Sequence, residues 1–239
     1  MTGVGIRFGI VGCGHASKNH ARALLQLPGA ELAAACDTDA GALENFTRLY
    51  GIRGYLHYEE MLEKEKNLDV MIICTPSEMH TAMGIMAACR GKHVLMEKPM
   101  ALSLESADRL IKACEKEGVY LSVVLQNRFK PAMQILKLAA DGAKFGQLSH
   151  GVATVRWNRN NDYYSRRPWR SSRDKGGGVL INQAIHSVDA LQWIMGEVDQ
   201  VIAQTTTRYR PIDAEDVCLA ILKFKSGALG LIEAASTVY

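Results

Sequence analysis

Two glycines and an aspartate near the start of the chain could together hold a dinucleotide. Gly12 and Gly14 stand in a Gly-x-Gly-x-x-Ser segment that follows an apolar run and precedes a helical pattern. At such a turn the first free amide groups of the helix, here those of His15 and Ala16, bind a pyrophosphate. Asp37 ends the second apolar run, where a carboxylate accepts hydrogen bonds from a ribose diol and repels a 2′-phosphate. The pattern predicts a site for NAD, with NADP disfavoured.

Two simpler interpretations compete with this one. The third position of the glycine motif is Ser17, and a Gly-x-Gly turn also occurs between a strand and a helix that bind nothing. Asp37 would equally serve as the cap of the helical pattern that starts at Ala40. The position of the motif, after a strand and before a helix, favours the dinucleotide site.

Two further polar stretches follow apolar runs. One is Thr75-Pro76-Ser77 with His80, and the other is Glu97-Lys98-Pro99. Open α/β sheets bind ligands at the carboxyl ends of their strands. We therefore expect Thr75, Pro76, His80, Glu97 and Lys98 to lie near the cofactor. A solvated lysine and a histidine that only starts a helix are the simpler alternatives.

The positive charge of the chain is concentrated in one segment. Residues 151–175 hold six arginines and one lysine against two aspartates, whereas the rest of the chain has a net charge of −2. This distribution argues against nucleic-acid binding by the whole protein. Arginine binds carboxylates and phosphates through paired hydrogen bonds, so the segment favours an anionic substrate. A solvated loop or an oligomer contact is the alternative. The arginines are Arg156, Arg159, Arg166, Arg167, Arg170 and Arg173.

Apolar runs typical of strands alternate with helical patterns up to residue 124, and this alternation stops after it. The alternation predicts a doubly wound parallel sheet, a Rossmann domain, over residues 1–124. Consecutive alternating runs near the end predict an α+β domain with a mostly antiparallel sheet over residues 125–239. The expected strands are Ile6–Val11, Glu31–Cys36, Val70–Cys74, His93–Met96, Tyr120–Leu125, Ser149–Trp157, Gln200–Tyr209, Val217–Lys225 and Ala228–Val238. The expected helices of the second domain are Pro131–Asp141 and one from Gly176 to Ile194.

Composition narrows the class of protein further. The chain has 239 residues, of which 48% are hydrophobic, yet no apolar run reaches the ~18 residues of a membrane span. Six cysteines form no Cys-x-x-Cys pair, so we expect reduced core thiols in a cytoplasmic protein. The histidines do not stand at ligand spacing from these cysteines, and no metal site is expected.

The motifs in their order resemble the Gfo/Idh/MocA oxidoreductase family, which is named after glucose–fructose oxidoreductase, inositol dehydrogenase and rhizopine catabolism. The resemblance is carried by the Gly12-x-Gly14 turn, by Glu97-Lys98-Pro99, and by Gly176-Gly177-Gly178 followed by His186. It implies a nicotinamide enzyme that oxidises or reduces a sugar or cyclitol carbon. It also implies that Lys98 lies beside that carbon, that the Lys98–Pro99 bond is cis, and that the protein forms homo-oligomers, dimers or tetramers.

The second family motif, Gly-Gly-x-x-x-Asp-x-x-x-His, is altered here. Asn182 replaces the aspartate, Gln183 follows it, and His186 is retained. Because an amide takes no proton, Lys98 and His186 are the titratable pair. A histidine with a pKa of about 6.5 suits a general base, with the lysine holding the hydroxyl oxygen, although the roles could be exchanged. The alternative for His186 is a helix residue bound to Asp189 or to a carbonyl.

Several stretches resemble one branch of the family, which oxidises C3 of UDP-N-acetylglucosaminuronate. They are Gln126-Asn127-Arg128, Tyr163-Tyr164, Trp169-Arg170 and Asn182-Gln183 with His186. The resemblance implies that Gln126 contacts the cofactor and that the substrate is bound by Asn127, Arg128, Tyr163, Tyr164, Arg170, Asn182, Gln183 and His186. The alternatives are an inositol or aldose dehydrogenase, for which a neutral polyol needs few cations, and a non-catalytic NAD sensor, for which the titratable pair has no purpose.

Members of the family are usually longer than this chain. The resemblance therefore implies a truncated form whose second sheet lacks strands. We expect the strand over Ala228–Val238 to be left as an open edge.

Overall fold

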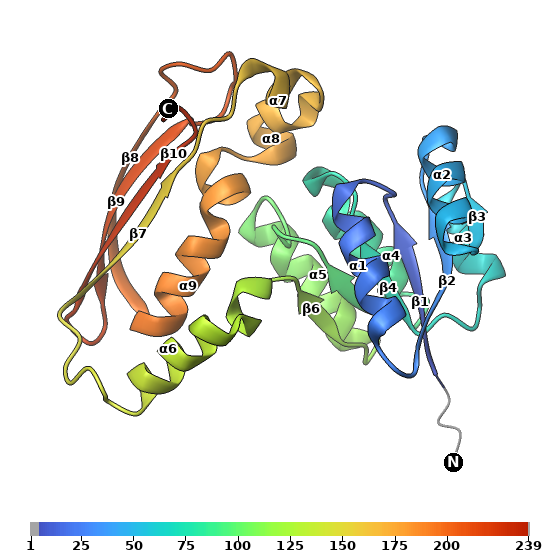
Figure 1. Cartoon of the computed structure of the whole chain (residues 1–239), viewed down its shortest axis with the longest axis horizontal. Helices are drawn as coiled ribbons and strands as arrows, with labels where there is room; N and C mark the ends of the chain where they lie inside the picture. Colours follow the sequence, from blue (N-terminus) through green and yellow to red (C-terminus); the bar gives the residue numbers. More distant parts are fainter. Residues whose placement is uncertain (1–4, 239) are drawn as a thin grey trace. The chain divides into compact units, whose positions relative to one another are not determined.

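The computed structural model describes residues 5–238, and the chain folds into two compact units, Met1–Val124 and Leu125–Tyr239 (Figure 1). Each unit is built around a sheet of its own. No helix among residues 5–238 is long and apolar enough to cross a membrane.

The first unit contains a six-stranded parallel sheet in the order β3-β2-β1-β4-β5-β6. Its strands are β1 (Ile6–Val11), β2 (Ala30–Cys36), β3 (Arg53–Tyr55), β4 (Val70–Ile73), β5 (His93–Met96) and β6 (Leu121–Val123). The order reverses between β1 and β4, which is the point where doubly wound sheets open a crevice for ligands. The predicted Rossmann fold is confirmed.

Helices cover both faces of this sheet (Figure 1). They are α1 (His15–Gln26), α2 (Ala40–Tyr50), α3 (Tyr58–Lys64), α4 (His80–Ala88) and α5 (Leu104–Lys116). Successive strand residues point to opposite faces. Ile10 therefore belongs to the apolar cluster that also holds Leu24 of α1 and Phe46 of α2. Its neighbour Val11 belongs to the cluster that also holds Leu110 of α5.

The sequence patterns missed β3, because this three-residue edge strand contains Gly54 and no apolar run. Helix α4 begins at His80 directly after a 3₁₀ turn, η1 (Ser77–Met79). Gly12 follows β1 with a φ of 92°, and a Cβ there would lie 2.6 Å from the carbonyl oxygen of Cys74. Only glycine allows the turn to pass so close to the end of β4.

The second unit contains a four-stranded sheet in the order β7-β10-β9-β8. Its strands are β7 (His150–Arg156), β8 (Val198–Thr206), β9 (Val217–Phe224) and β10 (Leu229–Ala235). Pairing is antiparallel except between β10 and β7, as predicted for a mostly antiparallel sheet. The expectation that the last strand is an open edge is wrong, because β7 joins it by a parallel pairing that local alternation does not reveal.

One face of the second sheet is covered by α9 (Ile185–Met195) (Figure 1). Leu191 and Met195 pack there against Ala153, Leu222 and Ile232. The helix α6 (Pro131–Asp141) has the predicted bounds and follows a 3₁₀ turn, η2 (Gln126–Phe129).

The basic segment is more ordered than a loop. It folds into α7 (Asn161–Ser165), the 3₁₀ turn η3 (Pro168–Ser171) and α8 (Arg173–Gly176). The helix expected from Gly176 starts instead as a π-helical segment, η4 (Val179–Ala184), which runs into α9. All six cysteines carry free thiols, and Cys89 is exposed, not buried as expected.

Candidate functional site

The glycine turn presents an uncapped helix end. Helix α1 begins at His15 without a side-chain cap and without an acidic residue in its first turn. Ser17, which occupies the third glycine position, is fully buried, and its hydroxyl donates to the carbonyl of Gly14 over 2.8 Å. Serine thus meets the packing requirement of that position, and the positive end of the helix dipole is left for an anion.

Asp37 is held at the end of β2 by two backbone amides. Its Oδ2 accepts from the amide of Cys13 over 2.7 Å, and its Oδ1 accepts from the amide of Asp39 over 2.9 Å. The cap of α2 is Asp39, which accepts from the amide of Ala42. Asp37 is therefore not the helix cap, and its carboxylate is fixed beside the glycine turn with lone pairs left for a diol.

The Glu97-Lys98-Pro99 turn follows β5, and its Lys98–Pro99 bond is cis. Glu97 Oε1 lies 2.8 Å from Nε2 of His20, and its Oε2 accepts from the amide of Lys98 over 3.2 Å. Burial raises the pKa of Glu97, but the hydrogen bond and charge of His20, with those of Lys98, hold it below its usual range. The carboxylate is charged at neutral pH.

His80 is placed differently from the expected cofactor contact. Its side chain is buried, with Nδ1 2.7 Å from the carbonyl oxygen of Pro99 and Nε2 2.9 Å from that of Thr75. Burial lowers the pKa of His80, and these two carbonyls oppose the shift only in part. With both nitrogens facing backbone oxygens, the ring binds the chain and is not available to a cofactor.

Thr75 and Pro76 lie at the end of β4, as expected. The hydroxyl oxygen of Thr75 is buried and has no hydrogen-bond partner within residues 5–238. A buried polar atom without a partner is costly unless a ligand satisfies it. This orphan atom, the uncapped α1 and the fixed carboxylate of Asp37 all lie at the carboxyl ends of neighbouring strands, so the first unit fits a dinucleotide.

In the second unit, Arg128 is already paired. Its guanidinium donates to both oxygens of Asp189, over 2.9 and 2.5 Å, and lies 5.5 Å from the ring of Trp193. Asp189 therefore binds Arg128. Arg128 anchors η2 to α9 through Nε and Nη2, and its predicted contact with the substrate stays a prediction.

Asn182 and Gln183 lie on η4 in a hydrogen-bonded network. The Gln183 amide accepts from Arg159 over 3.0 Å and donates to the Tyr163 hydroxyl over 2.7 Å and to Asn182 Oδ1 over 2.9 Å. Because Gln183 is buried and its amide is engaged on both sides, it orients Tyr163 and Arg159. It lines a small pocket with Tyr163 and Arg170, and its contact with a sugar hydroxyl stays a prediction. A π-helical segment such as η4 is a frequent mark of functional sites.

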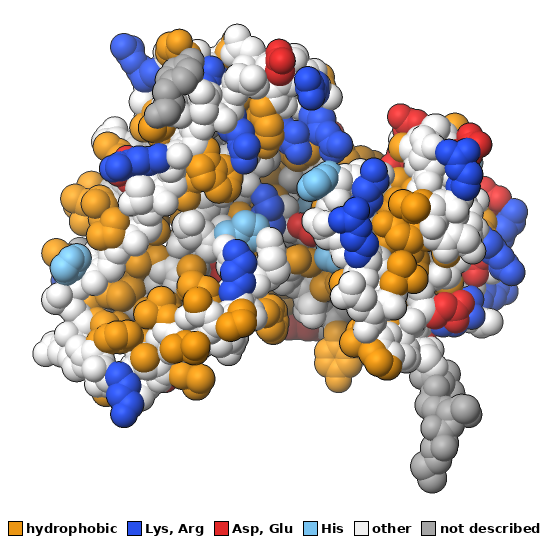
Figure 2. Space-filling model, in the orientation of Figure 1, with side chains coloured by type: hydrophobic (Ala, Val, Ile, Leu, Met, Phe, Trp, Pro, Cys, Tyr) orange, Lys and Arg blue, Asp and Glu red, His pale blue; other side chains and the backbone are white. Residues whose placement is uncertain are grey.

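Arg159 and Arg170 lie against aromatic rings. The guanidinium carbons of both are within 5 Å of the Tyr163 ring centroid, at 4.8 and 4.5 Å, and Arg159 also lies 4.7 Å from Trp157. Burial lowers the pKa of Arg170, and the neighbouring Arg159 and Arg167 add to the shift. Neither Arg159 nor Arg170 has a carboxylate within salt-bridge distance in the described chain. Figure 2 shows the basic side chains gathered over α7 and α8.

Two other predicted residues have different surroundings. Tyr164 is largely buried, packs edge-on against Tyr163 and donates its hydroxyl to Ser236 over 3.2 Å. It lines a small pocket with Tyr163, Arg170, Asn182 and Gln183, and its contact with the substrate stays a prediction. His186 is the second residue of α9 and lines, with Asn127, a cavity of about 500 Å³. The other walls of this cavity are largely apolar and include Met133, Leu136, Phe145, Leu191 and Met195.

The glycines before η4 allow a close approach. A Cβ on Gly178 would lie 1.9 Å from the carboxylate of Glu215, whose Oε1 accepts from the amide of Leu180 over 3.1 Å. Glu215 thus caps η4 through space that only glycine leaves open.

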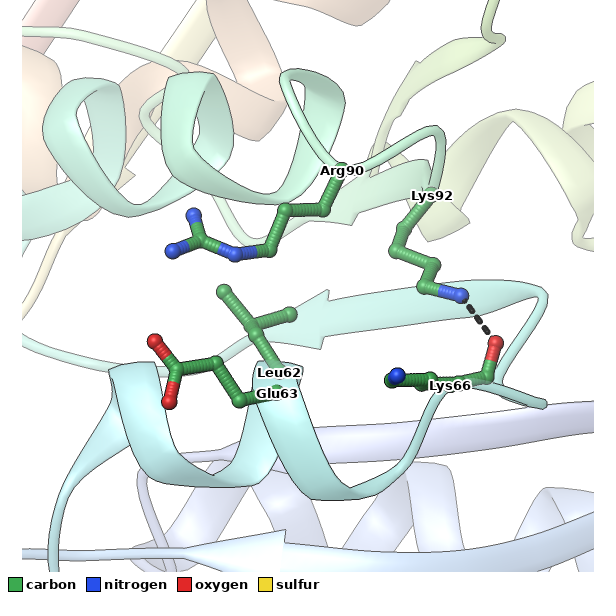
Figure 3. Close-up of a pocket in the computed structure, with 5 residues that line it drawn as sticks. All are labelled: Leu62, Glu63, Lys66, Arg90 and Lys92. Atoms are coloured by element: carbon green, nitrogen blue, oxygen red, sulfur yellow. Dashed lines mark hydrogen bonds between the residues drawn. The ribbon is translucent and has the colours of Figure 1, made fainter.

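A cavity of the first unit lies at the end of its sheet opposite the glycine turn. Leu62, Glu63, Lys66, Arg90 and Lys92 line a space of about 500 Å³ (Figure 3). Lys66 and Lys92 precede β4 and β5, so this cavity is at the amino ends of the strands. Lys92 is buried and donates to the carbonyl of Lys66 over 2.6 Å, which explains its burial without a ligand.

Two family models match the chain. The model described as "Oxidoreductase family, NAD-binding Rossmann fold" matches residues 6–125, and that of the GFO/IDH/MocA C-terminal domain matches residues 133–239. D-apiose dehydrogenase from Paraburkholderia graminis is 31% identical over 94% of this chain, which spans 59% of that protein. Myo-inositol 2-dehydrogenase from Thermotoga maritima is 30% identical over 95% of this chain and 68% of that protein.

Among solved structures, the WlbA dehydrogenase from Bordetella pertussis, in complex with NADH and UDP-GlcNAcA, is 40% identical with a TM-score of 0.96. The match covers 98% of this chain and 72% of that one.

Proposed function

Because this chain belongs to the Gfo/Idh/MocA family of oxidoreductases, we propose that it transfers a hydride between a sugar CH–OH group and NAD, and that the sugar is a nucleotide-linked uronate. In this proposal residues 1–124 bind the cofactor and residues 125–239 bind the substrate. The observation that carries the choice of substrate is the pair of arginines, Arg159 and Arg170, that face aromatic rings and have no carboxylate within salt-bridge distance among residues 5–238.

The residues of the first unit suit NAD. The uncapped end of α1 at His15 and the turn at Gly12 would hold the pyrophosphate, and Asp37 would accept the ribose diol. The orphan hydroxyl of Thr75 would gain a partner. When bound, the nicotinamide supplies the hydride acceptor.

Lys98 and His186 would carry the proton chemistry. The ammonium of Lys98 would hold the hydroxyl oxygen of the substrate. His186 would take the proton of that hydroxyl as the hydride leaves the carbon that bears it. The carbon is oxidised from an alcohol to a ketone, and the base keeps the proton. The exchanged assignment, with Lys98 as the base, uses the same two groups.

The guanidinium groups of Arg159 and Arg170 would favour anionic sugars over neutral ones. A guanidinium that is partly desolvated and has no carboxylate partner gains most from a ligand that brings negative charge. A uronate carboxylate and a pyrophosphate bring it, whereas inositol and apiose do not. The bound UDP-GlcNAcA of the WlbA relative supports the anionic substrate, and the names of the D-apiose and myo-inositol relatives keep the neutral one as the alternative.

The test is the formation of NADH from NAD⁺ with a panel of sugars. We expect UDP-N-acetylglucosaminuronate to be oxidised, and UDP-N-acetylglucosamine, myo-inositol and D-apiose to be poor substrates. Fast oxidation of a neutral polyol alone would favour the alternative. Binding of NAD without turnover of any sugar would favour a non-catalytic sensor.

We also propose that the outer face of the second sheet joins two copies of the chain in the cytoplasm. Val152, Leu231, Ile221 and Ile202 are paired in one row across all four strands, and each is at least 41% exposed. Such a continuous apolar row is typical of an interface. Light scattering should give the molar mass of a dimer or tetramer, and Ile221→Glu should shift this mass toward that of the monomer. A wild-type monomer at high concentration would contradict the proposal.

A further inference from the structure

Two histidines from two helices hold the Glu97-Lys98-Pro99 turn at its two ends. His20 of α1 lies 2.8 Å from the Glu97 carboxylate, and His80, the first residue of α4, lies 2.7 Å from the carbonyl oxygen of Pro99. The His20 side chain is 15% exposed and His80 is 1% exposed. Lys98, the residue between the two contacts, is the one to which the proposed reaction gives a catalytic role.

The contact of His20 passes through Glu97 to the backbone of Lys98. One oxygen of Glu97 meets the His20 ring, and the other accepts the amide of Lys98 over 3.2 Å. A half-buried carboxylate held from both sides has little freedom to rotate. A change in its orientation therefore shifts the Lys98 amide, which is bonded to the Cα that carries the Lys98 side chain.

The contact of His80 joins the turn to the neighbouring strand. Its ring lies between the carbonyl of Pro99, after β5, and the carbonyl of Thr75, after β4. A neutral imidazole donates from one nitrogen only, so one of the two carbonyls receives the hydrogen bond. The rigid ring sets the spacing between the two strand ends, both of which lie at the edge proposed to bind the nicotinamide.

We propose that His20 and His80 are positioning residues that clamp the Glu97–Pro99 turn from two sides and set the place of the Lys98 ammonium. The proposal rests on the proposed function, in which Lys98 contacts the reacting alcohol. A displacement of about 1 Å at a catalytic group costs up to ~10²-fold in rate, so a clamp of this kind has a measurable effect on turnover without touching the substrate.

Tyr58 is a matched control. It is also buried, in the same unit, and its hydroxyl donates to the carbonyl of Met83 over 3.2 Å. This hydrogen bond joins α3 to α4 and does not reach the turn. Tyr58→Phe thus removes one buried hydrogen bond of the same kind without a link to Lys98.

The experiment compares leucine variants with amide variants. In His20→Leu and His80→Leu we expect kcat to fall at least ~10-fold while the KM for NAD changes less than about twofold. His20→Gln carries an amide near the position of Nε2, and His80→Asn carries one near Nδ1, so each should recover most of the loss. Tyr58→Phe should leave kcat unchanged. Unchanged kcat in both leucine variants, an equal loss in Tyr58→Phe, or no recovery by the amides would overturn the proposal.

A second measurement does not depend on the substrate. The rate of reductive methylation of Lys98, relative to the exposed Lys112 of α5, is read by mass spectrometry in the NAD complex. We expect this ratio to change about threefold or more in the leucine variants, to return toward wild type in His20→Gln and His80→Asn, and to stay constant in Tyr58→Phe. If no sugar is oxidised, the proposed function fails, but a changed ratio still supports the clamp. An unchanged ratio in folded variants refutes it.

Discussion

The two units hold their charged groups in opposite ways. In the Rossmann unit the carboxylates of Asp37 and Glu97 accept hydrogen bonds from backbone amides and from His20. In the second unit the guanidinium groups of Arg159 and Arg170 lie over aromatic rings. The first arrangement fixes an anion and keeps lone pairs for hydroxyl groups. The second fixes a cation and keeps planar donors for an anion.

The arginines of the second unit also differ in whether a carboxylate compensates their charge. Arg128 and Arg156 pair with the carboxylates of Asp189 and Glu233, so their charge is already compensated. Arg170 has no such partner in the described chain and is partly desolvated. A local excess of positive charge is therefore concentrated at the aromatic cluster and not spread over the whole basic segment.

The largest expected effect tests the two residues proposed to be catalytic, Lys98 and His186. Lys98→Ala and His186→Ala should each slow turnover at least ~100-fold, because a general acid or base contributes ~10²–10⁴-fold. The affinity for NAD, measured by calorimetry, should change little in either variant. Arg90→Ala, in the cavity at the other end of the Rossmann sheet, is the control and should turn over normally. A near-normal rate in one of the two variants would remove that residue from the mechanism.

The next effect tests the difference between compensated and uncompensated arginines. Arg170→Ala should raise the KM for UDP-N-acetylglucosaminuronate about 10- to 100-fold, since a charge-assisted hydrogen bond is worth ~1.5–3 kcal/mol. Arg156→Ala removes the same charge from an exposed pair with Glu233 and should leave KM within about twofold. Equal effects in the two variants would show that only the overall charge matters.

A smaller effect is expected for Asp37, one of the carboxylates that backbone amides hold in the Rossmann unit. Asp37→Ala should weaken NAD binding about 10-fold, the scale of one lost charge-assisted hydrogen bond, and should narrow the preference for NAD over NADP. Calorimetric titration with both cofactors gives the two affinities. Asp39→Ala removes only the cap of α2 and should change stability, not preference. Tighter binding of NADP by the wild type would contradict the role of Asp37.

The smallest effect concerns pH. Burial holds the pKa of His80 in the folded protein below 6.5, its ordinary value. Between that folded pKa and pH 6.5 the unfolded chain binds a proton that the folded chain does not, so the free energy of unfolding falls as pH falls. The contribution of His80 is fully present above pH 6.5. Thermal unfolding should therefore show a steeper loss of Tm on acidification in the wild type than in His80→Leu, and parallel curves would contradict the assignment.

Local sequence was sufficient for the features that depend on contiguous residues. The apolar runs before Gly12, Thr75 and Glu97 predicted β1, β4 and β5, and helical periodicity predicted the bounds of α6. The turn at Gly12 follows from its place between a strand and a helix. These features need only a hydrophobic period and a backbone requirement, and both are written in neighbouring positions.

Tertiary structure decided which polar group meets which. His20 and Glu97 are 77 residues apart, Arg128 and Asp189 are 61 apart, and Tyr164 and Ser236 are 72 apart. Residue spacing could not show that Arg128 pairs with a carboxylate while Arg170 does not, nor that β7 pairs with the last strand. Many side chains of the right type compete for each partner, and only the packing of helices and strands brings one within about 3 Å. For that reason the sequence by itself predicted a dinucleotide fold and a cationic segment, whereas the histidine clamp and the uncompensated arginine emerged only from the folded chain.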